Sequence, residues 1–253
     1  MAADRLDTYR EKRDFTKTAE PAGGDKSPRK RKGHSYLIQK HEARNLHFDF
    51  RLEHEGVLKS WAIPRGPSMD PGDKRLAVRT EDHPLEYGKF EGSIPKGQYG
   101  GGTVMLWDEG TWEPIEDADE GFKDGKLKVF IHGKRLQGGF ALVRLRSDTG
   151  RKQGKENWLL IKEKDEFARP GEGTDLVESQ LTSVRTEREM EEISQGETEW
   201  HSNEPAEANV KRLKKLKPAA TARRAPRQRA TSPRRAAKKT TSAKKKRKRK
   251  SST

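Results

Sequence analysis

The sequence predicts a mainly β protein, built as a small closed β-barrel with short flanking helices and disordered termini. Short segments between about residues 36 and 164 alternate apolar with polar side chains and are separated by glycine-bearing turns, which is typical of antiparallel sheets. A closed barrel is favoured over an open sheet because closure leaves no exposed strand edges. Only 29% of the 253 residues are apolar, so the chain cannot be packed from end to end.

The composition divides the chain into four parts of different character. We expect a polar N-terminal arm and linker at 1–33, a β-barrel core at 34–165, a C-terminal extension with a short helix at 166–200, and a Lys/Arg-rich tail at 201–253. About 130 residues are enough for one hydrophobic core, so the barrel is expected to form a single domain.

Alternation of apolar and polar residues marks the strands of the barrel core. We expect a strand at 46–52, hairpins at 103–107 with 111–115 and at 126–131 with 140–145, and a further strand at 157–163. The Asp-Glu-Gly sequence at 108–110 is the expected turn of the first hairpin. In the extension, Thr186 and Glu189 have capping-box spacing and Gly196 suits a helix end, so a short helix is expected over 186–196.

All of the excess positive charge lies in the tail. The chain carries 55 Lys and Arg against 40 Asp and Glu, a net charge of +15, and residues 201–253 hold 20 of these cations with two acids, which is +18. Residues 1–200 therefore carry 35 cations and 38 acids, a net charge of −3. A polycationic segment without aromatic residues cannot bury enough apolar surface to fold alone, but it suits the phosphate backbone of nucleic acid. We expect a disordered, DNA-binding tail.

The composition also excludes several classes of protein. The chain has no cysteine, which rules out a disulfide framework and a thiolate metal site. No run approaches the roughly 18 apolar residues of a membrane span, and the polar N-terminus has no apolar signal region. We therefore expect a cytoplasmic, nucleoid-associated protein with no membrane partner.

Two histidines and an aspartate within nine positions have the character of metal ligands. On a strand over 46–52, His47, Asp49 and Arg51 point to one face and the apolar residues between them point to the other. His41 shares their parity and can return to the same face across a turn. Two imidazoles with one carboxylate suit Mn, Fe or Zn, and the adjacent guanidinium suits a phosphate oxygen. The pattern predicts a divalent-metal site beside an anion site.

A second group of polar residues follows at 75–87. Its members share parity, with apolar residues at alternate positions: Arg75, Arg79, Glu81, His83 and Tyr87. A histidine flanked by arginine, glutamate and tyrosine on one face is well placed to act as an acid or a hydrogen-bond donor. The pattern therefore predicts that His83 serves an anionic site.

The motifs at 41–51, 61–71, 75–92 and 94–104 together resemble the 3′-phosphoesterase domain of bacterial and archaeal DNA ligase D, in its stand-alone version with a basic tail. The resemblance covers roughly residues 6–200 and implies a small β-barrel metalloenzyme, typically Mn²⁺-dependent. It implies removal of a 3′-terminal ribonucleoside and then of the 3′-phosphate from DNA or DNA/RNA primer–template ends. The resulting 3′-OH would serve ligation in double-strand-break end joining, with a DNA ligase and an end-binding protein acting in trans.

The resemblance also assigns roles to individual residues. The metal ligands correspond to His41, His47 and Asp49, and the catalytic group corresponds to His83, Arg51, Arg75, Tyr87 and Glu81. Substrate-binding positions correspond to Arg13, Asp14, Gln39 and Arg65, where Arg65 replaces the lysine common in the family. In the expected mechanism, His83 is oriented by Glu81 and donates a proton to the leaving oxygen, while Tyr87 hydrogen-bonds the phosphate.

Two other functions fit parts of the sequence. A His-x-Asp motif with a distant histidine on a β scaffold also occurs in non-haem Fe(II) oxygenases. The nearby Arg51, Arg75 and Arg79 favour a phosphate substrate over that activity. A non-catalytic, DNA-compacting protein would instead use the cationic tail as its functional part.

Overall fold

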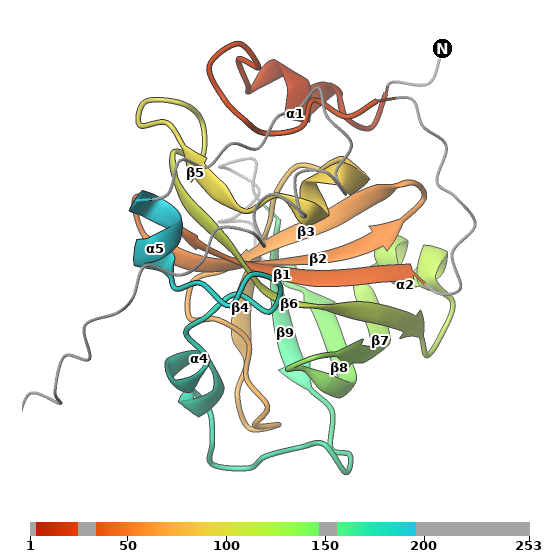
Figure 1. Cartoon of the computed structure of the whole chain (residues 1–253). Coiled ribbons are helices and arrows are strands. Elements are labelled where there is room, and N and C mark those ends of the chain that lie inside the picture. Colours follow the sequence, from red (N-terminus) through yellow and green to blue (C-terminus); the bar gives the residue numbers. More distant parts are fainter. Residues whose placement is uncertain (1–3, 25–33, 147–155, 196–253) are drawn as a thin grey trace, which may run out of the picture. The chain divides into compact units, whose positions relative to one another are not determined.

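The computed structural model describes residues 4–24, 34–146 and 156–195 (Figure 1). Its strands are β1 (His34–Glu42), β2 (Leu46–His54), β3 (Val57–Ile63), β4 (Arg75–Arg79), β5 (Gly92–Ile94), β6 (Gly102–Pro114), β7 (Lys126–Gly133), β8 (Gln137–Arg144) and β9 (Asn157–Lys162). Its helices are α1 (Asp7–Glu11), the 3₁₀ helix η1 (Leu85–Lys89), α2 (Ala118–Asp124), α4 (Asp175–Ser179) and α5 (Met190–Gln195).

Eight of these strands close into an antiparallel barrel, which confirms the predicted fold class (Figure 1). Around the ring the order is β1, β2, β3, β4, β9, β8, β7 and β6, and β6 pairs with β1 to complete it. The short strand β5 pairs with the start of β6. Every strand of the closed ring thus has a partner on both sides, and no long edge is left unpaired.

The wall of the barrel carries apolar side chains on both of its faces. The interior holds large residues that are completely buried, among them Phe50, Trp61 and Phe140. A second, smaller apolar cluster lies on the outer face, where Leu37 of β1 and Leu58 of β3 pack with residues of α1 and η1. The candidate site described below lies on this outer face.

One long strand replaces the first predicted hairpin, because β6 runs without a turn through positions 108–110. Its register against β1 shifts between Ile38 and Gln39, which marks a β-bulge. Gly110 then lies so close to β7 that a Cβ atom there would be 2.0 Å from the His132 carbonyl oxygen. This glycine therefore permits a close backbone contact in a bent strand and does not form the expected turn.

The other predicted elements occur, with one change in helix capping. β7, β8 and β9 lie within two or three residues of the predicted strands. α5 begins only at Met190, because the Glu192 carboxylate accepts the backbone N–H of Glu189 at 2.9 Å. The Thr186 hydroxyl donates to Glu91 instead, so the predicted cap at Thr186 is wrong. Gly196 and the tail at 201–253 lie outside the described residues.

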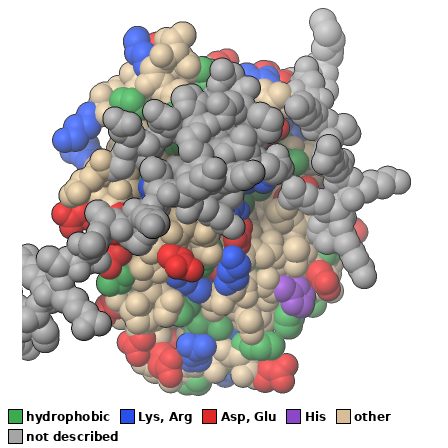
Figure 2. Space-filling model, viewed as in Figure 1, with side chains coloured by type: hydrophobic (Ala, Val, Ile, Leu, Met, Phe, Trp, Pro, Cys, Tyr) green, Lys and Arg blue, Asp and Glu red, His purple; other side chains and the backbone are tan. Residues whose placement is uncertain are grey.

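The described surface mixes the two signs of charge. Figure 2 shows acidic and basic side chains interspersed on the visible face, in keeping with the near balance of charge over residues 1–200. Within the described ranges, every helix is too short or too polar to span a bilayer.

Candidate active site

The β1–β2 hairpin carries the three residues expected to hold a metal. His41 lies directly opposite His47 in the antiparallel ladder, and Gln39 lies opposite Asp49 two residues along. Opposite residues of a ladder share a face, so these side chains leave the wall together. The two imidazole rings have centroids 4.7 Å apart. The structure thus brings together the predicted ligands His41, His47 and Asp49, which we call the metal triad.

Backbone carbonyls determine which nitrogen of each histidine faces the metal triad. His41 Nε2 lies 2.8 Å from the Gly100 carbonyl oxygen and His47 Nδ1 lies 2.9 Å from the Asn45 carbonyl oxygen, so these nitrogens carry the protons and donate. The opposite nitrogens, His41 Nδ1 and His47 Nε2, each lie 3.6 Å from a carboxylate oxygen of Asp49. Such carbonyl contacts are the usual means of orienting metal-ligating imidazoles.

The metal triad fits a divalent cation in both spacing and chemistry. One nitrogen of each histidine and one oxygen of Asp49 lie within 4.8 Å of one another. Burial opposes ionisation of Asp49, but the charge of Arg51 and the two imidazoles hold the pKa of this carboxyl well below its usual range. Two imidazoles and a carboxylate are a suitable donor set for Mn, Fe or Zn.

Arg51 lies beside the metal triad with its guanidinium held on three sides. Its Nε donates to the Gln39 side-chain oxygen at 2.8 Å, and its terminal nitrogens donate to the Ser60 hydroxyl at 2.8 Å and to Asp49 at 3.0 Å. The guanidinium carbon lies 4.8 Å from the centroid of the Tyr87 ring. A guanidinium fixed in this way can meet a phosphate oxygen without losing further side-chain freedom.

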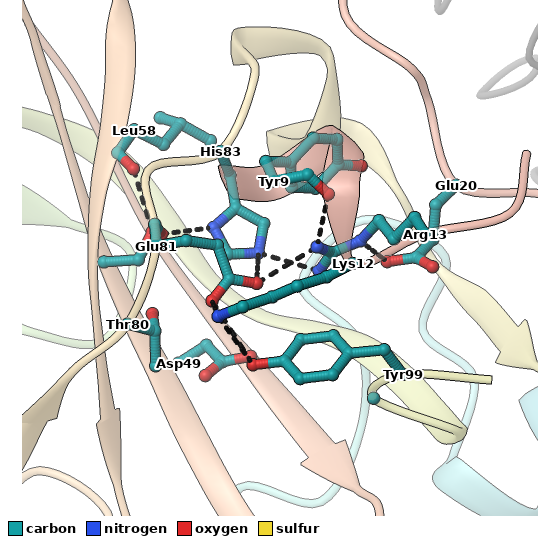
Figure 3. Close-up of polar contacts among 12 residues, drawn as sticks. Tyr9, Lys12, Arg13, Glu20, Asp49, Leu58, Thr80, Glu81, His83 and Tyr99 are labelled. Atoms are coloured by element: carbon teal, nitrogen blue, oxygen red, sulfur yellow. Dashed lines mark hydrogen bonds and ion pairs between the residues drawn. The ribbon is translucent and has the colours of Figure 1, made fainter. Parts of the chain in front are cut away.

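His83 reaches this region through an isolated β-bridge to Leu58 of β3. Its Nδ1 donates to the Glu81 carbonyl oxygen at 2.9 Å, so the lone pair lies on Nε2, 3.4 Å from a terminal nitrogen of Arg13 (Figure 3). Burial, together with the positive charges of Arg51 and Arg13, lowers the pKa of His83 well below its usual value. His83 is therefore neutral in the free protein near neutral pH.

The Glu81 carboxylate anchors the N-terminal segment rather than the His83 ring. It accepts hydrogen bonds from Arg13 at 3.0 Å, Lys12 at 3.1 Å and the Tyr99 hydroxyl at 3.3 Å (Figure 3). Its closer oxygen is 3.9 Å from His83 Nε2, so Glu81 orients His83 through its backbone carbonyl. Lys12 and Tyr99 could not be identified from the sequence, because contacts between distant segments leave no local pattern. We call Arg13, Glu81 and His83 the arginine–histidine cluster.

Residues 4–24 pack against this cluster, so the expected N-terminal arm contains a structured segment. Arg13 pairs with Glu20 at 2.9 Å as well as with Glu81, and its guanidinium carbon lies 3.9 Å from the Tyr9 ring centroid. Tyr9 is completely buried, and its ring meets the His83 ring edge-on at 5.1 Å. The arginine–histidine cluster is therefore complete only when the N-terminal segment is docked.

Arg75 departs most clearly from the expected site. Arg79 lies opposite Trp61 in the β3–β4 ladder, and the Trp61 side chain fills the barrel interior. Alternation along β4 therefore turns both Arg79 and Arg75 inward. Arg51 lies opposite Ser60, the neighbour of Trp61, so Arg51 faces outward. Arg75 is paired there with Asp73 at 2.7 Å. The prediction that the whole group at 75–87 shares one face is wrong, because β4 ends at Arg79 and strand parity has no meaning beyond that point.

The expected substrate-binding residues take different places. Arg13 lies in the arginine–histidine cluster, as described above. Gln39 is completely buried and donates to two backbone carbonyls at and after η1, so it positions Arg51. Asp14 pairs with its neighbour Lys17 at 2.7 Å. Arg65 is exposed in the turn after β3.

Comparison with known proteins shows similarity to one family. Residues 39–144 match the family described as the DNA Ligase D 3′-phosphoesterase domain. The chain is 46% identical over 187 residues to the multifunctional non-homologous end joining protein LigD of Pseudomonas aeruginosa. The aligned region covers 73% of this chain and 22% of that protein. It is 41% identical over 175 residues to LigD of Mycolicibacterium smegmatis, covering 66% of this chain and 22% of that protein. The chain thus spans about a fifth of the length of these relatives.

Proposed function

Because residues 39–144 form a domain of the DNA ligase D 3′-phosphoesterase family, we propose that this chain hydrolyses phosphate esters at the 3′ ends of DNA. It removes a 3′-terminal ribonucleoside and then the 3′-phosphate, and leaves a 3′-OH that a ligase can seal. Its similarity to non-homologous end joining proteins supports a role in double-strand-break repair.

The observation that carries this proposal is the position of Arg51 beside the metal triad. Asp49 is a member of the triad and also accepts a hydrogen bond from Arg51, so a cation and a guanidinium can reach oxygens of the same phosphate. On a strand face that was simply solvated, an arginine would be exposed, whereas Arg51 is only 2% exposed. A buried guanidinium next to the ligands also favours a phosphate substrate over oxygenase chemistry.

The donor set suits a divalent cation, and we assign Mn²⁺ as the ion. His41 Nδ1, His47 Nε2 and an oxygen of Asp49 would hold it. When bound, such an ion would neutralise a phosphate oxygen and lower the pKa of a coordinated water.

Arg51 and Arg13 bind the other oxygens of the phosphate in this proposal. Both guanidinium groups are held in place before substrate arrives, Arg51 by Gln39 and Ser60 and Arg13 by Glu20. Preoriented donors stabilise negative charge that grows in the transition state without a further cost of reorganisation. The ring of Tyr87, which we expected to hydrogen-bond the phosphate, supports Arg51 through its π face.

His83 is the proposed acid at the leaving oxygen. In the free protein, burial and the charges of Arg51 and Arg13 keep it neutral. A bound phosphate offsets those positive charges and so favours the protonated ring. Nε2 then donates its proton to the leaving oxygen as the P–O bond breaks, while Nδ1 remains bonded to the Glu81 carbonyl.

We also propose roles for the cationic tail and for partner proteins. The 20 cations at 201–253 would contact duplex phosphates, so DNA binding is strongly salt-dependent and indifferent to base order. A DNA ligase and an end-binding protein act in trans on the product.

A primer–template that ends in one ribonucleotide tests this function directly. The purified chain is incubated with it in the presence and absence of Mn²⁺, and the 3′ products are resolved by electrophoresis. We expect loss of the ribonucleoside followed by a 3′-OH end, only with Mn²⁺, and no product from His47→Ala. An unchanged primer under every metal condition would reject the proposal.

Deletion of 201–253 separates the enzyme from the DNA-compacting alternative. The shortened chain should bind duplex more weakly but retain most of its Mn²⁺-dependent hydrolysis. If neither form hydrolyses the primer and the tail alone condenses DNA as well as the whole chain does, the protein is a DNA-compacting protein.

A further inference from the structure

Tyr99 is an exposed aromatic side chain at the edge of the candidate active site. It lies in the glycine-rich loop between β5 and β6, one residue before Gly100, whose carbonyl oxygen orients His41. The residue is 47% exposed. Among the large apolar side chains that are exposed in the described ranges, it is the only aromatic one, since the others are leucines and an isoleucine.

Contacts with Glu81 and with two cations of the N-terminal segment hold the ring in place. The Tyr99 hydroxyl donates to Glu81 at 3.3 Å and accepts from Lys12 at 3.4 Å. Lys12 Nζ and the Arg13 guanidinium carbon lie 4.9 and 5.3 Å from the ring centroid. Figure 3 shows the ring extending from its loop toward Glu81 and Lys12. Through Gly100 the same loop is tied to the metal triad.

The exposed part of the ring has no task in the fold or in the charge network. Glu81 pairs with Lys12 and Arg13 directly, so the ion pairs do not depend on an aromatic residue. The metal triad, Arg51 and the arginine–histidine cluster supply charged and imidazole groups, which recognise a phosphate but not the nucleoside attached to it. Aromatic rings bind nucleobases by stacking, which contributes about 5- to 150-fold in affinity per base and accepts every base.

We propose that Tyr99 stacks on the base of the terminal nucleoside that carries the scissile 3′-phosphate. The inference rests on the proposed function, which puts that phosphate beside the metal triad and Arg51. Because the ring contacts Glu81 and Arg13 and the next residue, Gly100, contacts His41, we expect a nucleoside attached to this phosphate to come within reach of the ring. Tyr99 thereby selects for the presence of a base at the 3′ end and is indifferent to which base it is.

Two primer–templates that differ only in the terminal nucleotide test this role. Both end in a 3′-phosphate, one on a nucleotide with adenine and the other on a tetrahydrofuran analogue of an abasic site, which has no aldehyde and cannot lose its phosphate by β-elimination. The proteins compared are the full wild-type chain, Tyr99→Ala, Tyr99→Phe, and Ile115→Ala as the control. Ile115 follows β6 at its far end and is 51% exposed, so it matches Tyr99 in exposure but not in place.

The quantity to measure is the ratio of the KM values for the abasic and adenine primers. We expect this ratio to be about 5 to 100 in the wild type, in Tyr99→Phe and in Ile115→Ala, and about 1 in Tyr99→Ala. Fluorescence anisotropy of the same primers in EDTA should give the same ratios for the dissociation constants, without any dependence on turnover.

Three results would overturn the inference. One is an unchanged ratio in Tyr99→Ala, and another is a ratio near 1 in the wild type. The third is loss of the ratio in Tyr99→Phe as well, since the hydroxyl bond to Glu81 would then matter and not the ring. If the wild type hydrolyses neither primer, the proposed function fails, and the anisotropy ratios alone decide whether Tyr99 stacks on a base.

Discussion

The metal triad and the arginine–histidine cluster lie in one site but are built in different ways. The triad comes from a single hairpin, in which His41 and His47 face each other across the β1–β2 ladder. The cluster joins Arg13 to Glu81 and His83, which lie 68 and 70 positions further along the chain. Strand register brings the triad side chains together, whereas the cluster requires the docked N-terminal segment. Metal binding and phosphate turnover should therefore respond to different substitutions.

Loss of a triad ligand should have the largest effect. His47→Ala should weaken Mn²⁺ binding and lower kcat/KM by more than about 100-fold, because changes to the groups that merely orient a ligand already cost about 10- to 100-fold. Mn²⁺ titration followed by electron paramagnetic resonance and hydrolysis of a 3′-phosphate primer measure the two effects. His132→Ala is the matched control, since this exposed histidine lies in β7, away from the triad. Normal Mn²⁺ affinity in His47→Ala would show that the triad does not hold the ion.

Arg13→Ala should separate the two halves of the site. It removes a preoriented donor, for which we expect a fall in kcat/KM of about 100-fold, while Mn²⁺ affinity stays within about twofold. Arg10→Ala serves as the control, because Arg10 is on the same segment but pairs with Asp4 near the surface. A parallel loss of metal affinity in Arg13→Ala would show that the triad also depends on the N-terminal segment.

Glu81→Gln should have a smaller effect on the arginine–histidine cluster. The amide retains hydrogen-bonding capacity but loses the charge that attracts Lys12 and Arg13, so a fall in kcat/KM of about tenfold is expected. His83 should keep its proton on Nδ1, because the partner of that nitrogen is the backbone carbonyl of residue 81. Nitrogen NMR shifts of the imidazole report this tautomer. A changed tautomer would mean that the carboxylate orients His83 after all.

The smallest effect is a dependence of stability on pH that arises from His83. Its pKa in the folded protein lies below the usual value of about 6.5, so the unfolded chain takes up this proton first as the pH falls. The contribution of His83 to the free energy of unfolding has its full value above about pH 6.5. Below that pH it decreases, by at most about 1.4 kcal/mol per pH unit. Urea unfolding of the metal-free protein between pH 7 and 5 should show a shallower decrease in His83→Gln. Equal slopes would contradict the burial of a neutral ring.

The metal triad could be predicted from sequence because its geometry follows from local rules. His47 and Asp49 alternate with buried phenylalanines on a single strand, and period-two alternation places them on one face. His41 joins them through the register of the adjacent strand, which a short turn enforces. Gly110 shows the limit of such rules. Glycine is favoured both in a turn and where two strands lie very close together, so the residue type alone does not distinguish the two.

The arginine–histidine cluster could be predicted only in part, because it depends on tertiary contacts. The parity rule placed Arg75 on one face with His83, but the chain leaves the sheet after Arg79. The resemblance placed Arg75 with Arg51, but these two side chains lie on opposite faces of the wall. Resemblance to a family indicated Arg13, whereas Lys12 had no local pattern to distinguish it. Its contact to Glu81 spans 69 residues and exists only when the N-terminal segment is docked.

Anomalous diffraction from crystals soaked with Mn²⁺ tests the central claim most directly. We expect a peak within coordination distance of His41 Nδ1, His47 Nε2 and an Asp49 oxygen, and no such peak in crystals of His47→Ala. A peak at the group formed by His54, Glu55 and Asp119, which also has the spacing of metal ligands, with none at the triad would contradict it.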